Sequence, residues 1–402
     1  MLTTIIIFIA VLAVLVLSHE WGHFYAARRN GIRVDEFGFG FPPRLGGVRL
    51  LRRKTGADQK LPAKKWEWIL GSKEITEEIR DENYEYGTLY SFNLLPLGGF
   101  VKIKGENATE NGGNDADSFA TKKAWQKALV LCAGVGMNIV VAIVLITAGM
   151  LLGAPQDISN LKNVDNIKDR KVMILGVMPG QPAEKAGIQS GDAIIKLDDL
   201  ERPRLKELQT YVDEHRDRSI SLTLERESQL ITVDLQPIVN TSTNKAVFGV
   251  GIMESGVYPW YKALYMGAVQ TFQILWAIMV AFYELIAGLV MGRGLSADVS
   301  GPIGVAKMTG QVARLGFMYL VQFTAMLSLN LAVLNILPIP ALDGGRLLFV
   351  IIGKIMRRPV TPKIEQWAHV IGFMFLMLIV ILATGKDLNV VEWVSGLWQK
   401  VF

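Results

Sequence analysis

The sequence predicts a polytopic α-helical membrane protein with four transmembrane helices, a membrane-associated β-region and one soluble α+β module. Half of the 402 residues are apolar and the mean hydropathy is positive, as is typical of integral membrane proteins. Several apolar runs are long enough to cross a hydrocarbon core of about 30 Å as helices. Residues 165–238 differ from the rest, because charged and apolar residues alternate there between glycine and proline turns.

Composition excludes some classes of partner and site. The net charge of +5 is modest, and no run of lysine and arginine is interleaved with aromatic residues. We therefore expect no nucleic-acid partner. The one cysteine, Cys132, lies inside an apolar run, so neither an intrachain disulfide nor a cysteine-ligated metal cluster is expected.

The first predicted transmembrane helix lies within residues 1–30. No charged side chain occurs between Thr3 and Ser18. A cleaved signal peptide would begin with positive charge, so this segment is expected to remain as a helix. The positive charges come after it, at Arg28, Arg29, Arg33, Arg44, Arg49, Arg52, Arg53 and Lys54. By the positive-inside rule, the N-terminus is extracytoplasmic and the chain after the helix is cytoplasmic.

Residues 31–120 predict a membrane-associated β-region and a loop on the cytoplasmic side. An alternating aromatic pattern predicts a strand at 36–48, and an apolar pattern predicts a second strand at 94–104. We expect these strands to form a small sheet that dips into the membrane, because backbone at that depth must be paired. Residues 49–87 hold two tryptophans among lysines, as is typical of the headgroup level. Residues 105–118 have the composition of a loop.

The second predicted helix lies within residues 121–153 and runs outward. Gly134 and Gly136 have no side chain to hold a neighbouring helix away. The amide of Asn138, which follows them, serves either a bond to the neighbouring helix or the functional site, and the sequence leaves both roles open.

Charge also decides which later apolar runs cross. The third helix, within residues 317–345, ends on the cytoplasmic side, because positive charges follow it at Arg346, Lys354, Arg357, Arg358 and Lys363. It would end outside if residues 262–291 crossed as well. We therefore expect 262–291 to be an interfacial helix in an extracytoplasmic linker, 239–316. A fourth crossing at 364–385 leads to a C-terminal tail, 386–402.

Residues 165–238 resemble bacterial PDZ domains along their whole length. The glycine and proline pattern of those domains occupies the run from Gly176 to Asp192. The predicted elements are strands at 172–177, 193–197, 219–225 and 229–235 and a helix at 204–215. PDZ domains bind a peptide tail as an added strand, which implies a peptide groove at Gly176 and Val177. A steric gate without a specific ligand is the alternative.

The residues with the clearest chemistry lie in the first helix. His19 and His23 are about one helical turn apart, so both imidazoles leave one face, and Glu20 lies beside them. A catalytic zinc site needs three protein ligands and an open position for water. Asp343 is the expected third ligand, because a carboxylate at an apolar helix end is functional by default. The prolines before it break the helix, and the glycines after it let the backbone turn.

The estimated depths of the candidate ligands in the membrane agree with one another. Eighteen residues at about 1.5 Å rise take the chain roughly 27 Å inward, which places His19 near the cytoplasmic face, where Asp343 also ends its helix. We expect one Zn²⁺ per chain, reached by water from the cytosol. His369, expected at a helix interface, and His215, in the soluble module, are weaker ligand candidates.

These parts predict peptide hydrolysis. Zinc lowers the pKa of water at such a site to about 7, and Glu20 is expected to accept its proton and pass it to the leaving amine. The oxyanion also needs an amide donor. Asn335 is the first candidate and Asn330 the second, with helix–helix hydrogen bonding as the alternative role of each. A strand that would hold an unwound substrate by edge pairing contains Gly98, Gly99, Phe100 and Val101.

At these residues the chain resembles the site-2 protease family (peptidase family M50) of intramembrane zinc metalloproteases. The resemblance is to the bacterial, PDZ-containing type that includes the regulator of sigma-E protease. His19 to His23 fits the HExxH motif of the family, Leu342-Asp343-Gly344 fits its LDG motif, and Asn335 falls at the asparagine before it. The run Gly301–Gly304 is similar to another family run. One departure is that some relatives carry two tandem PDZ domains, whereas one is found here.

The resemblance implies a zinc metalloendopeptidase that cleaves transmembrane segments of single-span proteins, such as anti-sigma factors or remnant signal peptides. It implies a multi-pass protein of the bacterial inner (cytoplasmic) membrane, with the N-terminus and PDZ domain extracytoplasmic and the active site near the cytoplasmic face. Its partners would be these substrates, the lipid bilayer and a peptide or protein tail at the PDZ domain. A membrane scaffold would not need Glu20, and a zinc transporter would need a second cluster of membrane ligands.

Overall fold

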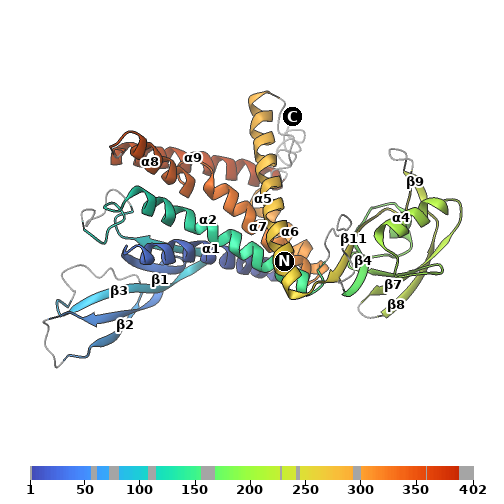
Figure 1. The fold of residues 1–402 in the computed structure, drawn as a ribbon, viewed down its shortest axis with the longest axis horizontal. Coiled ribbons are helices and arrows are strands. Elements are labelled where there is room, and N and C mark those ends of the chain that lie inside the picture. Colours follow the sequence, from blue (N-terminus) through green and yellow to red (C-terminus); the bar gives the residue numbers. More distant parts are fainter. Residues whose placement is uncertain are drawn as a thin grey trace, which may run out of the picture. The chain divides into compact units, whose positions relative to one another are not determined.

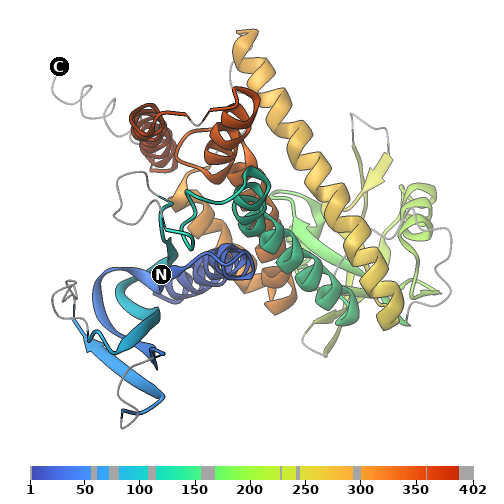
Figure 2. The same ribbon diagram turned by 60° about the vertical axis from the view of Figure 1, so that its left-hand side comes forward.

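The chain forms two compact units in the computed structural model (Figures 1 and 2). The first unit comprises residues 1–142, 273–310 and 326–402, and the second comprises 143–272 and 311–325. The structure describes residues 2–55, 61–71, 81–106, 115–154, 168–226, 229–240, 245–292, 300–358 and 360–388. Most of the predicted loop at 105–118 and of the predicted tail at 386–402 lies outside the described residues.

Five helices among the described residues are long and apolar enough to cross a membrane. They are α1 (Leu2–Arg29), α2 (Ala124–Leu151), α5 (Trp260–Val290), α7 (Phe317–Ile336) and α9 (Pro362–Asp387). Four of them match the predicted crossings, and α5 matches the predicted interfacial helix. Length and composition do not distinguish a crossing helix from one that lies on the membrane, so the number of crossings stays a prediction.

Helices α1 and α2 pack antiparallel and bury small side chains. His23 of α1 contacts Val130 of α2, whereas His19, one turn earlier, contacts Asn138. A Cβ atom on Gly22 would lie 2.3 Å from the carbonyl oxygen of Ala133, so glycine is required there for the two backbones to approach.

The run Gly301–Gly304, at the start of α6 (Pro302–Leu315), contacts the C-terminal end of α9. The backbone N–H of Gly304 donates to Asp387 Oδ2 at 2.6 Å. Further along α6, a Cβ atom on Gly310 would lie 2.4 Å from Thr4 Cγ2 in α1. The N-terminal end of α1, the helix α6 and the C-terminal end of α9 therefore meet.

A three-stranded antiparallel sheet follows α1, in the order β2-β1-β3. The predicted pairing of the aromatic strand with the apolar strand is confirmed, since Phe37 faces Val101. Both long strands bend, so Tyr90 of β3 pairs with Phe37 on one side and Val48 on the other, and residues 99–103 form an edge. The strands are β1 (Val34–Arg53), β2 (Lys64–Leu70) and β3 (Tyr84–Ile103).

The sheet is larger than the two predicted strands and extends into residues 49–87. This stretch contains the end of β1, all of β2 and the start of β3. Residues of β2 alternate between a buried and an exposed side, with Ile69 buried and Trp66 and Trp68 exposed. The charged residues that obscured this alternation are themselves partly paired, as in the contact of Arg49 Nε with Glu67 Oε2 at 2.5 Å.

The second unit contains an α+β module around one sheet of order β11-β4-β5-β7-β8, with β6 paired to β5. Its helices are α3 (Pro182–Lys185) and α4 (Leu205–Glu214), and every strand and helix predicted for the module has a counterpart. Fully buried aliphatic residues fill its core, for example Ile174, Leu197 and Ile220. The strands are β4 (Lys168–Val177), β5 (Ala193–Leu197), β6 (Leu200–Glu201), β7 (Ile220–Arg226), β8 (Gln229–Leu235), β9 (Ile238–Asn240), β10 (Lys245–Val247) and β11 (Val250–Val257).

The sheet extends beyond the predicted end of the module at residue 238, because β11 pairs with β4. This changes the predicted peptide groove. Gly176 already pairs with Gly251 and Val177 with Val250, so a peptide cannot add beside these two residues on that side. β11 and β8 are the two terminal strands of the described sheet, and a strand added on the β11 side of β4 would have to pair with β11.

Candidate metal centre

Two histidines on one face of α1 form the base of the candidate site. His19 Nε2 and His23 Nε2 lie 3.1 Å apart, and both residues are more than nine-tenths buried. The one-turn spacing produces this convergence. Space for the two rings comes from α2, where a Cβ atom on Gly134 would lie 2.3 Å from His23 Nε2 and 2.7 Å from His19 Cε1.

Asp343 completes the group from the first residue of α8 (Asp343–Ile355). Its Oδ2 lies 3.0 Å from His19 Nε2 and 3.2 Å from His23 Nε2. The prediction that Asp343 ends the third apolar helix is wrong in detail, because α7 stops at Ile336 and a separate helix begins at Asp343. The prolines at 338 and 340 explain the break, since neither can donate a helical hydrogen bond.

The two glycines after Asp343 allow the backbone of α8 to lie close to the preceding turn, and neither is needed for an unusual backbone conformation. Neither has a positive φ. A Cβ atom on Gly344 would lie 2.2 Å from the Leu337 carbonyl oxygen, and one on Gly345 would lie 2.3 Å from the Ile339 carbonyl oxygen. Small residues are thus needed for the start of α8 to rest on the preceding turn, which sets the position of the Asp343 carboxylate.

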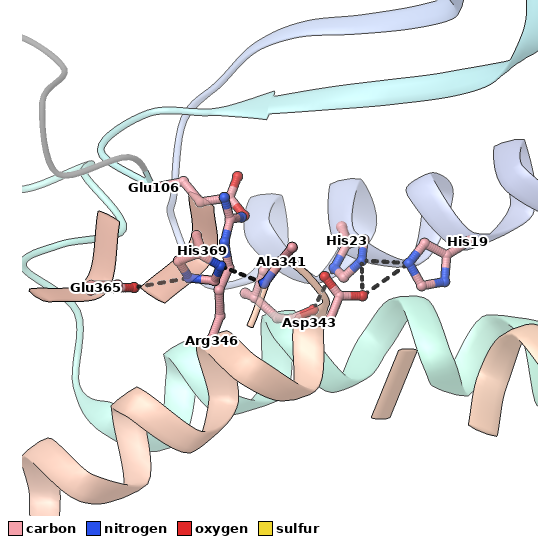
Figure 3. A network of polar contacts seen from close by, with 9 residues as sticks. His19, His23, Glu106, Ala341, Asp343, Arg346, Glu365 and His369 are labelled. Carbon is pink, nitrogen blue, oxygen red and sulfur yellow. Dashed lines mark hydrogen bonds and ion pairs between the residues drawn. The ribbon is translucent and has the colours of Figure 1, made fainter. Parts of the chain in front are cut away.

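Zinc fits this triad of His19, His23 and Asp343. The three ligand atoms form a triangle with sides of 3.0, 3.1 and 3.2 Å (Figure 3). Ligands about 2.1 Å from a tetrahedral zinc ion lie about 3.4 Å apart, and catalytic zinc sites have three protein ligands and an open position. The triad is the one group of three or more such side chains with metal-binding spacing among the described residues.

The outer ring nitrogens of both histidines also have partners. His23 Nδ1 lies 2.9 Å from the Val130 carbonyl oxygen, to which it donates when Nε2 is free to bind metal. His19 Nδ1 faces the Asn138 amide, with Nδ2 at 3.3 Å. Asn138 is fully buried, and its Oδ1 has no partner among the described residues. A half-turn of the amide would let His19 Nδ1 donate to Oδ1 and leave Nε2 as a ligand.

Two cavities open beside the triad. The larger, about 360 Å³, is lined by Glu20, His23, Phe100, Val101, Lys102, Ile103, Glu106, Asp343 and Arg346. The smaller, about 230 Å³, is lined by Val16, His19, Glu20, Asn138, Leu331, Asn335, Ala341, Leu342 and Asp343. Glu20 borders both cavities. Its carboxylate therefore lies where a water molecule and a substrate could each reach the metal ligands.

Comparison with known proteins identifies the family. The sequence model of peptidase family M50 matches residues 7–56 and 72–379. These ranges contain the histidine pair and the aspartate. The chain belongs to peptidase family M50. It is thus a zinc metalloprotease, with Zn²⁺ as its cofactor.

Relatives that align along nearly the whole chain are also named as zinc metalloproteases or as a protease. A Clostridium perfringens protein named as a zinc metalloprotease is 32% identical and is covered over 93% of this chain and 95% of its own. The zinc metalloprotease RasP of Oceanobacillus iheyensis is 28% identical over 96% of this chain and 99% of its own. The regulator of sigma-W protease RasP of Bacillus subtilis is 28% identical over 96% and 98%.

A solved PDZ-domain structure is similar to part of the chain. The PDZ domain of an SdrC-like protein from Listeria monocytogenes is 14% identical with a TM-score of 0.19, and covers 20% of this chain and 85% of its own. The resemblance of residues 165–238 to PDZ domains therefore rests on the glycine and proline pattern and on the predicted strands, which the structure contains.

Of the other predicted site residues of this M50 peptidase, some line the two cavities and one does not. Asn335 lines the smaller cavity. Asn330 lines neither cavity and donates to the Met326 carbonyl oxygen of its own helix at 3.0 Å, so its predicted role at the substrate is not supported. Phe100 and Val101 line the larger cavity.

The glycines before Phe100 let β3 approach α1. A Cβ atom on Gly98, which has a φ of 128°, would lie 2.9 Å from Val16 Cγ1. One on Gly99 would lie 2.9 Å from Leu17 Cδ2. These contacts are within one turn of His19, so the two glycines allow the strand edge to lie close to this part of α1.

The chain just beyond this edge is held by charged groups. Lys104 Nζ lies 2.6 Å from Asp115 Oδ2 and 2.8 Å from Asp117 Oδ1. Burial acts to lower the pKa of Lys104, but the hydrogen bonds to the two carboxylates outweigh it and raise that pKa. Burial acts to raise the pKa of Asp117, and the bond from Lys104 lowers it overall. The charged forms of both partners are thus favoured.

An ion pair that the sequence did not indicate crosses the larger cavity. Arg346 Nη1, three residues after Asp343, binds Glu106 Oε1 just after β3 (Figure 3). Both side chains line the cavity. The pair joins the first turn of α8 to the chain that leaves the sheet edge.

We expect Arg346→Ala to raise the KM of peptide cleavage several-fold with unchanged metal content. Without this partly buried ion pair, the chain after β3 is no longer held to α8 at the cavity, while the three residues of the triad are unchanged. Steady-state kinetics and metal analysis would measure this. Lys354→Gln, on an exposed turn of the same helix, is the control for the charge change. A normal KM in Arg346→Ala would show that the pair does not shape the cavity.

Three residues at the site were missed or left open by sequence reasoning. Asn138 had two open roles and contacts His19, whereas Arg346 was predicted only as a topogenic charge and Glu106 had no predicted role. Arg346 follows Asp343 by three residues, which is a helical spacing that points to one face. Glu106 carried no local signal, because its place at the site depends on the path of β3.

Proposed function

We propose that this M50 peptidase is an intramembrane endopeptidase that cleaves transmembrane segments of single-span membrane proteins. The observation that carries this proposal is the position of the metal ligands within apolar helices. His19 and His23 belong to α1, whose most apolar 18-residue window has a mean hydropathy of 2.6. A peptide bond that reaches this triad would do so at the level of the membrane.

The site residues divide the proposed reaction into three roles. His19, His23 and Asp343 would hold the zinc ion, which would supply a Lewis acid for activating water and polarising the carbonyl group. Glu20 accepts the proton of the attacking water and passes it to the nitrogen of the leaving amine. The side-chain N–H groups of Asn335 donate to the oxygen that becomes negatively charged.

The edge of the sheet is the proposed substrate platform. Residues 99–103 end the strand order next to the larger cavity. An unwound segment of substrate would pair with this edge as an extended strand, with Gly98 and Gly99 keeping the edge close to α1 and Phe100 and Val101 facing the segment. This arrangement presents a peptide bond to the triad without requiring the enzyme to bind a helix.

We further propose the orientation in the inner membrane of a bacterial cell. The positive charges after α1 and after Asp343 favour a cytoplasmic location for the nearby metal site. The contacts of Gly310 with Thr4 and of Gly304 with Asp387 support one extracytoplasmic level for the start of α1, for α6 and for the end of α9. In this orientation α5 lies at the outer interface and the α+β module is extracytoplasmic, where it binds a protein tail or acts as a gate.

The proposed substrates are anti-sigma factors or remnant signal peptides. The Bacillus subtilis relative is named as a regulator of sigma-W protease, which favours the first class. The enzyme would act on such proteins in the lipid bilayer, with no nucleic-acid partner.

Cleavage of a tagged single-span protein in proteoliposomes tests the function. The wild-type enzyme should cut within the apolar segment, as mass spectrometry of the fragments would show. A zinc chelator and the Glu20→Gln variant should each stop the cut. Cleavage only in soluble loops would contradict the intramembrane proposal, and binding without any cleavage would favour a scaffold.

We expect Asn335→Ala to lower kcat by roughly 10²–10³-fold with little change in KM. The loss of one donor to an oxyanion has this effect in other hydrolases. Single-turnover cleavage of the same membrane substrate would measure it. Asn330→Ala is the matched control, because Asn330 bonds within its own helix. Equal kinetics in the two variants would remove Asn335 from the reaction.

A further inference from the structure

The last helix contacts the turn that precedes Asp343. The backbone N–H of Ala341 donates to His369 Nδ1 of α9 at 2.7 Å (Figure 3). Three residues further along α9, a Cβ atom on Gly372 would lie 2.2 Å from the Pro340 carbonyl oxygen. Since only 6% of the most apolar window of α9 is buried, these contacts are among the few that fix the helix.

The turn depends on this bond because its other backbone donors are used locally or missing. Ile339 N–H donates to the Leu337 carbonyl oxygen and Leu342 N–H to that of Ile339. The prolines at 338 and 340 have no N–H to donate. The N–H of Ala341 is thus the donor through which the turn is held by another helix.

Ala341 also has an unfavourable backbone conformation. Its φ is 82°, in the left-handed region that side chains other than glycine rarely adopt. Residues held in such a conformation persist when surrounding contacts determine it, and they cluster at functional sites. Asp343 follows two residues later, so a relaxation of Ala341 would move the start of α8 and its carboxylate.

The acceptor role defines the state of the imidazole. Nδ1 can accept from Ala341 only when it carries no proton, so the proton of neutral His369 is on Nε2. Nε2 is buried, and its nearest acidic atom is Glu365 Oε1 at 3.9 Å. His369 lies outside the metal triad and outside the residues that line the two cavities.

We propose that His369 is a positioning residue, which holds Ala341 in its left-handed conformation and thereby keeps the carboxylate of Asp343 at the metal site. Through this bond α9 becomes part of the metal centre without supplying a ligand. The inference rests on Asp343 being a metal ligand but not on the location of the substrate.

The test is the zinc affinity of the full-length protein in detergent, measured by competition with a chelating dye. His369→Leu should lower the affinity about 10-fold, as the loss of an outer partner of a ligand does. His369→Asn, whose amide oxygen can replace Nδ1 as acceptor, should stay within about 3-fold of the wild type. Ile371→Ala, at a position of α9 that is 65% exposed, is the control for α9.

A second substitution separates positioning from general loss of packing. Glycine adopts a positive φ without steric cost, so Ala341→Gly in the His369→Leu background should recover most of the zinc affinity. A Co²⁺-substituted protein should show the same pattern in its visible absorption, with altered bands in His369→Leu and restored bands in the double variant.

The alternatives give different results. Normal zinc affinity in His369→Leu, or no recovery in the double variant, would overturn the positioning role. Asp343→Asn separates this failure from a wrong ligand assignment. If Asp343→Asn loses zinc while the His369 variants do not, only the inference about His369 fails. If Asp343→Asn retains zinc, the ligand assignment itself fails and the inference fails with it.

Discussion

Glu20→Gln should lower the rate of peptide cleavage by roughly 10²–10⁴-fold, the range that general acid–base catalysis contributes. Glutamine keeps the size of the side chain but cannot accept a proton from water. Glu20 is not one of the three groups at metal-binding spacing, so the zinc content should not change. Fragment analysis after incubation with a membrane substrate, together with metal analysis of the purified protein, would measure both quantities.

Asp343→Asn is the informative comparison for that result. Asp343 Oδ2 lies within 3.2 Å of both histidine nitrogens, so replacing the carboxylate with an uncharged amide would weaken metal binding directly. The two variants should thus be equally inactive but differ in zinc content. Zinc loss in Glu20→Gln, or full activity in it, would contradict the role of Glu20 as the base.

The histidine pair could be predicted from the sequence because helical periodicity is a local property. A spacing of four residues on any helix brings two imidazoles together, whatever surrounds them. The link to Asp343 required a different argument, in which charge asymmetry and helix length placed distant residues at one depth. That argument chose the aspartate that the structure brings to the histidines but assigned it to the wrong helix, because α7 and α8 are separated by a turn that two prolines create.

The sheets show where local reasoning stops. The alternating pattern of Phe37 predicted a strand, but not that Tyr90 would pair with it as well as Val101. The module boundary at residue 238 was too early for the same reason, since β11 is identified by its pairing with β4. Pairing between distant strands depends on the whole topology, which a local pattern does not contain.

Glycines illustrate the same limit at the site itself. Gly134 and Gly136 had the same interpretation in the sequence, as small residues in an apolar helix. In the structure, a Cβ atom on Gly134 would collide with the two histidines, whereas nothing lies within 4 Å of one on Gly136. The two positions differ by only two residues, and only the packing of α2 on α1 distinguishes them.

A side chain at position 134 should therefore disturb the metal site. Gly134→Ala should lower zinc affinity by at least about 10-fold and reduce peptide cleavage with it. The added methyl group would lie 2.3 Å from His23 Nε2. His23 has little freedom to retreat, because Nδ1 is held at the Val130 carbonyl oxygen. Overpacking of a tight interior costs about 1–3 kcal/mol, and here it falls on the ligand atoms.

Gly136→Ala is the matched control on the same helix. Both substitutions gain about 1 kcal/mol of helix propensity, so a difference between them cannot come from the helix itself. Gly136→Ala should keep wild-type zinc affinity and activity and unfold at the same temperature or higher. Chelator competition and thermal unfolding of the three proteins would measure this. Equal zinc affinity in the two variants would mean that α2 does not confine the histidines, and that α1 alone sets their geometry.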